Sequence, residues 1–115
     1  MIAIKQYDGT NIIEFTLDGC MTHEEFDKIA EKMLIVLRQH EKIRLIEVIK
    51  DEPSVMWRDM KKVPKHLKNF SHIAVVADQK WIEWISRITK PVVCAELRIF
   101  KLDEIENARE WIKHV

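Results

Sequence analysis

The sequence predicts an α/β domain with a mixed, mainly parallel five-stranded sheet and helices packed on it. Two short runs, 43–49 and 72–77, are apolar with few interruptions, which is typical of strands covered on both faces. Segments with helical spacing of apolar residues alternate with the strands, and this order implies right-handed parallel crossovers. A length of 115 residues suits one domain, so we expect a single unit over 1–115.

The chain begins with a predicted hairpin and a capped helix. Residues 2–4 and 13–17 alternate apolar and polar side chains on either side of an Asp-Gly-Thr turn at 8–10. Thr22 and Glu25 have the spacing of a capping box, so a helix is expected to begin near Thr22. Its apolar stripe is Phe26, Ile29, Ala30, Met33 and Leu37.

The middle of the chain is expected to alternate strand and helix. After the strand at 43–49, the segment 55–70 is helical to about residue 62 and must break near Pro64. The strand at 72–77 is followed by a helix that Asp78 caps and that ends before Pro91. This third helix carries Trp81, Trp84, Ile85 and Ile88.

The C-terminal elements are an edge strand and a last helix. Residues 95–100 alternate, with Glu96 and Arg98 on one face, as in a half-exposed strand at the edge of a sheet. Asp103 and Glu106 have capping-box spacing, which predicts the start of a helix whose apolar stripe is Ile105, Ala108 and Ile112. The expected order is therefore ββαβαβαβα.

Composition excludes several classes of protein. The 19 basic and 19 acidic residues balance, so nucleic acid is not an expected partner. Cys20 and Cys94 are far apart and the histidines are scattered, so we expect reduced thiols and no metal site. Residues 1–7 lack the basic start and apolar run of a signal peptide, so we expect none, and no apolar run approaches the length that spans a membrane. We expect a soluble, cytoplasmic protein.

Catalytic motifs are absent from the sequence. No G-x-S-x-G is found, and Gly9 and Gly19 fall in no phosphate-binding frame. We therefore expect no enzyme and no cofactor.

Four stretches carry a resemblance to a known family. They are 72–77 (His-Ile-Ala-Val-Val-Ala), 78–84 (Asp-Gln-Lys-Trp-Ile-Glu-Trp), 95–100 (Ala-Glu-Leu-Arg-Ile-Phe) and 108–112 (Ala-Arg-Glu-Trp-Ile). The chain resembles the SpoIIAA-like proteins over nearly its whole length. The resemblance implies a fold similar to the STAS domains of anti-sigma-factor antagonists and sulfate transporters, and to lipid-binding CRAL-TRIO domains.

Ser54 marks a departure from the regulatory STAS proteins. Those antagonists present a phosphorylatable serine in an Asp-Ser-Gly type of turn, whereas here the serine follows Pro53 and lacks the glycine. An N-cap is the simpler role for Ser54, and phosphorylation is the alternative.

Glu47 is the most informative carboxylate, because it interrupts a strand that should be covered. A buried charge must be paired or neutralised. An ion pair with a neighbouring lysine or arginine is the more frequent arrangement, and a pocket acid with a raised pKa is the functional alternative. The candidate ligand-binding residues are Glu47, Asp51, Trp57, Met60 and Trp81.

The segment 55–70 is a second candidate, because it combines apolar side chains with clustered positive charge. A basic amphipathic helix can bind an anionic membrane surface, here the inner face of the cell membrane, or an acidic partner. An ordinary covering helix with solvated lysines has the same composition. The basic residues are Arg58, Lys61, Lys62, Lys65 and Lys68.

Three functions remain open. The first is a non-catalytic binding or regulatory module that holds an apolar or amphipathic small ligand or docks on a membrane. The second is a protein-interaction switch of the antagonist type, working with a regulatory protein through Ser54. The third is an enzyme with a pocket carboxylate such as Glu47 or Asp51. A homodimer is compatible with any of them.

Overall fold

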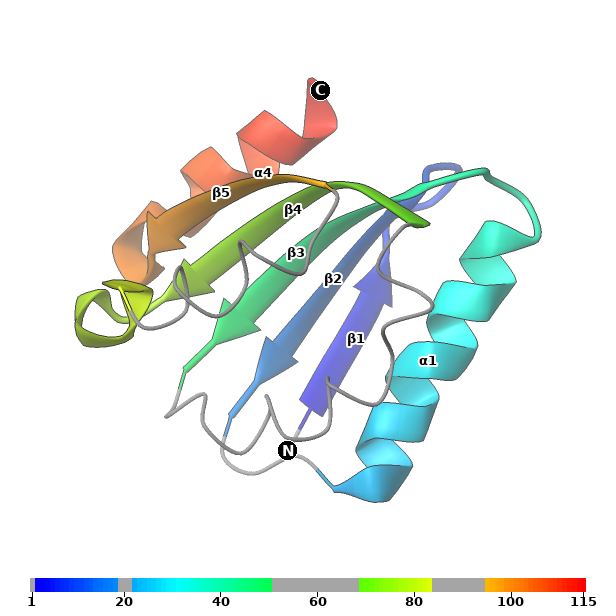
Figure 1. The fold of residues 1–115 in the computed structure, drawn as a ribbon, viewed down its shortest axis with the longest axis horizontal. Coiled ribbons are helices and arrows are strands. Elements are labelled where there is room, and N and C mark those ends of the chain that lie inside the picture. Colours follow the sequence, from blue (N-terminus) through cyan, green and yellow to red (C-terminus); the bar gives the residue numbers. More distant parts are fainter. Residues whose placement is uncertain (1, 19–21, 51–68, 84–94) are drawn as a thin grey trace.

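The computed structural model describes residues 2–18, 22–50, 69–83 and 95–115 (Figure 1). Five strands form one sheet in the order β1-β2-β3-β4-β5, in which β1 runs antiparallel to β2 and all other neighbours are parallel. This mixed, mainly parallel sheet is the predicted one. The elements are β1 (Ile2–Gln6), β2 (Ile12–Leu17), α1 (His23–Leu37), β3 (Ile43–Ile49), β4 (Phe70–Ala77), β5 (Glu96–Lys101), a 3-10 helix (Leu102–Glu104) and α4 (Ile105–Lys113).

The turn between β1 and β2 confirms the predicted hairpin. Gly9 has φ 70°, a left-handed conformation that glycine adopts without steric cost. The N–H of Tyr7 donates to the carbonyl of Ile12 at 3.0 Å, and the N–H of Thr10 donates to the carbonyl of Tyr7 at 3.0 Å. These bonds set the register of the two strands.

Helix α1 begins with the predicted capping box. The Glu25 N–H donates to the Thr22 hydroxyl at 3.1 Å, and the Thr22 N–H donates to the Glu25 carboxylate at 3.2 Å. Of the predicted stripe, Ile29 is buried, and Met33 and Leu37 pack against the core. Val36 is fully buried as well, although the predicted stripe omitted it.

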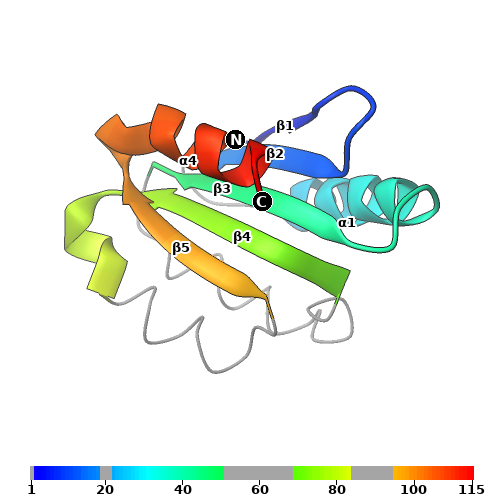
Figure 2. The same cartoon turned by 90° about the horizontal axis from the view of Figure 1, so that it is seen from above.

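Two apolar clusters lie on the two faces of the sheet, as the parallel strands require. One cluster joins the sheet to α1, and we call its side of the sheet the α1 face. The other joins the sheet to α4, on the α4 face. Helix α4 lies over β3, β4 and β5, and α1 contacts β3 from the other side of the sheet (Figures 1 and 2). The buried strand residues of the α1-face cluster are Ile13, Phe15, Leu17, Ile43, Leu45, Ile49, Phe70, Ile73, Val75 and Ala77, and those of the α4-face cluster are Ile12, Ile46, Val48, Ala74 and Val76.

The predicted start of the last helix is wrong. The chain first makes a 3-10 turn, and the Glu104 carboxylate accepts a hydrogen bond from the Lys101 N–H at 2.9 Å. Leu102 packs into the α4-face cluster, so tertiary contact decides where the helix begins. The predicted stripe is confirmed, because Ala108 and Ile112 are buried and Ile105 packs beside them.

Strand β5 is an edge strand of the sheet, as predicted, and Glu96 and Arg98 on it are exposed. The Asp78 side chain accepts from the Lys80 N–H at 3.1 Å, which is the expected cap, and residues 79–83 are helical. The expected helix at 55–62, its break at Pro64, the continuation of the third helix to Pro91 and both cysteines lie outside the described residues. Within the described ranges, no helix is long and apolar enough to cross a membrane.

Candidate functional site

Two glutamates are buried within the sheet, on neighbouring strands and opposite faces. Glu14 on β2 is 8% exposed and is paired in register with Ile46, on the α4 face. Glu47 on β3 is 2% exposed and lies between Phe15 and Val75 in register, on the α1 face. These two are the buried charged side chains of the described part of the chain. Their surroundings differ in a way that separates a structural role from a candidate site.

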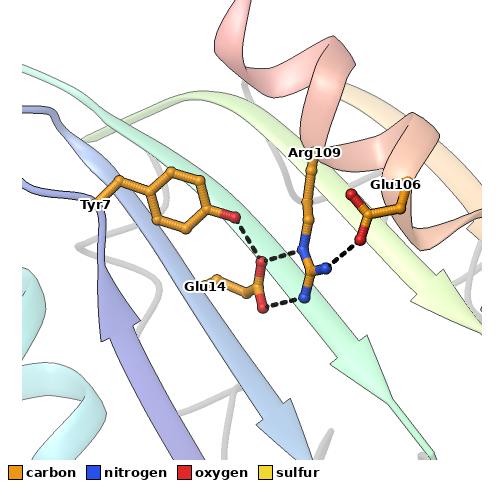
Figure 3. Close-up of polar contacts among 4 residues, drawn as sticks. All are labelled: Tyr7, Glu14, Glu106 and Arg109. Atoms are coloured by element: carbon orange, nitrogen blue, oxygen red, sulfur yellow. Dashed lines mark hydrogen bonds and ion pairs between the residues drawn. The ribbon is translucent and has the colours of Figure 1, made fainter.

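Glu14 is fully provided with hydrogen-bond donors (Figure 3). The Arg109 guanidinium donates from Nε to Oε1 at 2.9 Å and from Nη2 to Oε2 at 2.9 Å. The Tyr7 hydroxyl donates to Oε1 at 2.8 Å. Glu106 on α4 accepts from the remaining arm of Arg109. The two-pronged contact between Arg109 and Glu14 ties α4 to β2.

These contacts keep Glu14 charged. Burial alone would raise its pKa, but the hydrogen bonds from Arg109 and Tyr7 outweigh burial, so the pKa of Glu14 lies below its ordinary value. Burial, together with the hydrogen bond to Glu14, raises the pKa of Tyr7 to about 12. The group is therefore a satisfied structural connection.

A second polar connection holds the end of α4. Arg44 on β3 donates from Nε to the Asn11 side-chain oxygen at 2.6 Å. Its Nη1 donates to the carbonyl of Ile112 at 2.9 Å and reaches that of Lys113 at 3.4 Å. Because the last carbonyls of a helix lack partners within the helix, Arg44 acts as a C-terminal cap supplied by the sheet.

In the described part of the chain, Glu47 lacks hydrogen-bond donors such as those that Arg109 and Tyr7 supply to Glu14. Its Oε1 atom is buried without a hydrogen bond, and the ion pair that we considered the more frequent arrangement is not found among the described residues. Its neighbours on the α1 face are apolar, namely Phe15, Leu45, Ile49 and Val75. Burial raises the pKa of Glu47 to about 7, so the carboxyl gains and loses its proton near neutral pH.

Of the other predicted ligand-binding residues, Trp81 is described. It is half-buried and packs against the α1-face cluster, which is the side of the sheet that bears Glu47. The ammonium of Lys80 lies 5.4 Å from its ring centre. The predicted ligand residues Asp51, Trp57 and Met60, the candidate phosphorylation site Ser54 and the basic residues Arg58, Lys61, Lys62, Lys65 and Lys68 lie outside the described residues.

A polar group on the α4 face was not predicted from the sequence. His72 lies opposite Glu96 in register, with Nε2 3.5 Å from the carboxylate, and its Nδ1 is 3.0 Å from the Ser71 hydroxyl. Trp111 meets the His72 ring edge-on at 5.8 Å, and Arg98 lies over the indole at 5.3 Å. Across the described ranges, no group of three histidine, cysteine or carboxylate side chains could hold a metal ion.

Comparison with known proteins agrees with this architecture. The SpoIIAA-like family model matches residues 12–113, and the chain belongs to the SpoIIAA-like family. A similar solved structure is an uncharacterized DUF3478-family protein with a SpoIIAA-like fold from Shewanella loihica PV-4, with a TM-score of 0.70 and 21% identity. The match covers 97% of this chain and 92% of that one. No curated protein matches the chain.

Proposed function

We propose that this protein is a small non-catalytic binding module that holds an apolar or amphipathic ligand against the α1 face of the sheet, with Glu47 as its polar contact. The observation that carries the proposal is the buried, unpartnered carboxyl of Glu47. A buried polar group without a partner typically costs about 1 to 3 kcal/mol, so such groups in folded proteins call for an explanation. A ligand that forms a hydrogen bond with the Glu47 carboxyl would explain why the described residues themselves supply no partner.

The contrast with Glu14 supports this reading. The same sheet buries both carboxyls, and the chain supplies Glu14 with donors from Tyr7 and Arg109. The packing of the fold therefore permits a fully satisfied buried glutamate. Trp81 adds a half-buried aromatic surface on the side of the sheet that bears Glu47, and apolar walls with few polar groups are typical of small-molecule sites.

An enzyme that uses Glu47 is a second candidate. A carboxyl whose pKa is about 7 has the proton affinity that general acid–base catalysis at neutral pH favours. The binding module is preferred because the described neighbours of Glu47 on the α1 face, Phe15, Leu45, Ile49 and Val75, are apolar and supply no second catalytic group. Turnover of any bound compound, lost in Glu47→Gln with binding retained, would favour the enzyme.

Membrane docking through 55–70 and a switch at Ser54 remain proposals from composition alone. Replacing Lys61, Lys62 and Lys65 by glutamate is expected to weaken binding to vesicles that contain anionic lipid, if that surface docks on membranes. Phosphate on Ser54 in protein from its native cell, detected as an added mass on the intact chain, would support the switch.

The binding proposal is tested by native mass spectrometry of the freshly purified full chain. We expect a co-purified small molecule of defined mass in the wild type, and its loss in Glu47→Leu. Glu14→Gln is the matched control, because it changes a buried glutamate on the opposite face and should leave the bound mass in place. A wild-type chain that carries no ligand, and takes up none from a cell extract, would contradict the proposal.

A further inference from the structure

From the chemistry of the unpartnered oxygen, we propose that the ligand presents to Glu47 an alcohol or a protonated amine, a hydrogen-bond donor without negative charge, at one end of an apolar body. This inference rests on the proposed function and names the class of ligand that the same site would take. The juxtaposition that carries it is one buried acceptor, Oε1 of Glu47, among the apolar side chains Phe15 and Val75.

The Oε1 atom of Glu47 is buried without a hydrogen-bond partner in the described part of the chain. An ionised carboxylate only accepts hydrogen bonds, and a protonated carboxyl still keeps one oxygen that accepts. The ionised carboxylate therefore lacks a donor at Oε1, and the protonated carboxyl lacks one there when Oε2 carries the proton. Alcohols and ammonium groups donate, whereas an ester, an ether or a carboxylate offers only acceptors.

The negative charge of Glu47 limits the charge that a ligand can carry. Burial is the cause of the raised pKa of Glu47, and among the described residues no positive charge offsets it. A carboxylate ligand would place a second negative charge beside Glu47, where the described strands supply no compensating cation, and like charges that share a buried site repel strongly. Two carboxyls can share one proton, but that arrangement is lost once the pH exceeds both pKa values. Fatty acids and similar anions are thus disfavoured above neutral pH.

The apolar surroundings of Glu47 favour a ligand with an apolar body. The side chains beside Glu47 on β2, β3 and β4 are Phe15, Leu45, Ile49 and Val75, which offer contact to hydrocarbon and no further polar group. A fully polar ligand would lose its hydration there without replacement. The combination of one donor with a hydrocarbon chain or ring satisfies both features.

The test compares three ligands that share one hydrocarbon chain: octanol, octylamine and octanoate. Each is titrated into the full-length protein at about pH 8, where Glu47 is mainly ionised, and binding is followed by calorimetry. Because a hydrogen bond to a charged group has a net value of about 1.5 to 3 kcal/mol, octanol and octylamine should bind at least about tenfold more tightly than octanoate.

Two variants assign the preference to Glu47. In Glu47→Leu the three affinities should converge to within about threefold, since the acceptor and its charge are gone. Glu47→Gln keeps an acceptor oxygen without the charge, and should therefore retain more of the affinity for octanol than of that for octylamine. Glu14→Gln, on the α4 face, should leave the preference of the wild type unchanged.

The outcomes separate the two proposals. Octanoate binding as tightly as octanol, or a preference that persists in Glu47→Leu, would overturn this inference and leave the binding module standing. If none of the three ligands binds to the wild type, and native mass spectrometry finds no other occupant, the proposed function itself fails and the inference with it.

Discussion

A carboxyl group that leaves water keeps its charge only where protein donors replace the water. Glu14 and Glu47 illustrate the two outcomes on adjacent strands. Arg109 and Tyr7 replace the water around Glu14, and its pKa falls. Glu47 lies among hydrocarbon and its pKa rises to about 7. The same residue type thus acts as a structural anchor at one position and as a candidate binding group at the other.

The raised pKa of Glu47 makes a prediction about stability. Because the folded value, about 7, exceeds the ordinary value of 4.5, the folded state binds the proton more tightly than the unfolded state. The resulting stabilisation is complete below about pH 4.5 and is lost as the pH rises through about 7. Relative to Glu47→Leu, the wild type should lose roughly 3 kcal/mol of unfolding free energy between about pH 4 and about pH 8.

Urea unfolding of both proteins across this pH range measures the difference. Comparison with the variant removes the contributions that the two proteins share. A difference that stays constant with pH, or that grows in favour of the wild type as the pH rises, would show that Glu47 is paired or solvated.

Tyr7 gives an independent prediction, because it is the only tyrosine in the chain. Ultraviolet absorbance of tyrosinate should report a pKa of about 12 for the folded protein, above the ordinary value of 10.0, because the phenol is partly buried and donates to Glu14. In Glu14→Gln the midpoint should move toward 10, since the negative acceptor is gone. A wild-type midpoint at the ordinary value, in protein that is still folded, would contradict the contact.

At the scale of elements, two arginines hold α4 to the sheet: Arg44 reaches it from β3, and Arg109 reaches from the helix to β2. The helix has nine residues, a length that is marginal in isolation. Its apolar stripe packs on the sheet through Ala108 and Ile112, and Arg44 caps its last carbonyls. Arg109, in the middle of the helix, binds Glu14 on β2. The helix is thus held at its centre by packing and at two further points by charge.

Removal of the Arg109 side chain tests this account of α4. Arg109→Met should reduce the unfolding free energy by about 2 kcal/mol or more, because the buried Glu14 carboxylate loses both hydrogen bonds from the guanidinium and the positive charge beside it. Arg98→Met is the matched control: Arg98 is exposed on β5 and contacts the Trp111 ring, so its loss should be about 0.5 to 1 kcal/mol. Denaturant titration compares them, and equal losses would contradict the anchor.

Sequence and structure agree where the signals are local. The alternation that predicts the hairpin, the Asp-Gly turn and the Thr22–Glu25 box all act within a few residues, and each is found as expected. The predicted start of α4 was wrong because the capping hydrogen bond forms between Lys101 and Glu104, at a 3-10 turn, and not between Asp103 and Glu106. Leu102, by packing on the sheet, shifts the helix start to Ile105.

The candidate site was predictable in part. A glutamate within the apolar run 43–49 indicated a buried charge, and Glu47 is buried. Its missing partner could not be predicted, because pairing depends on which elements cover each face of the sheet. The contact between Glu14 and Arg109 joins residues 95 positions apart, and no local pattern announces it. Only the sheet register reveals that the two glutamates face opposite ways.

At the scale of the whole molecule, the structural polar contacts and the candidate site lie on opposite faces of the sheet. The α4 face carries the satisfied contacts of Arg44 and Arg109, and the α1 face carries Glu47. Belonging to the SpoIIAA-like family accounts for the strand order and the helices. It does not by itself specify a ligand, since one fold hosts many functions. The carboxyl of Glu47 is therefore the feature that points to a ligand.

The most direct test is a carbon NMR titration of the glutamate side-chain carboxyls, with Glu47 assigned by comparison with Glu47→Gln. The account predicts a midpoint for Glu47 near 7, well above the ordinary value of 4.5, and a midpoint for Glu14 below that value. A Glu47 midpoint at or below 4.5 would mean that the carboxyl is paired or in water, and would contradict the unpartnered site on which both proposals rest.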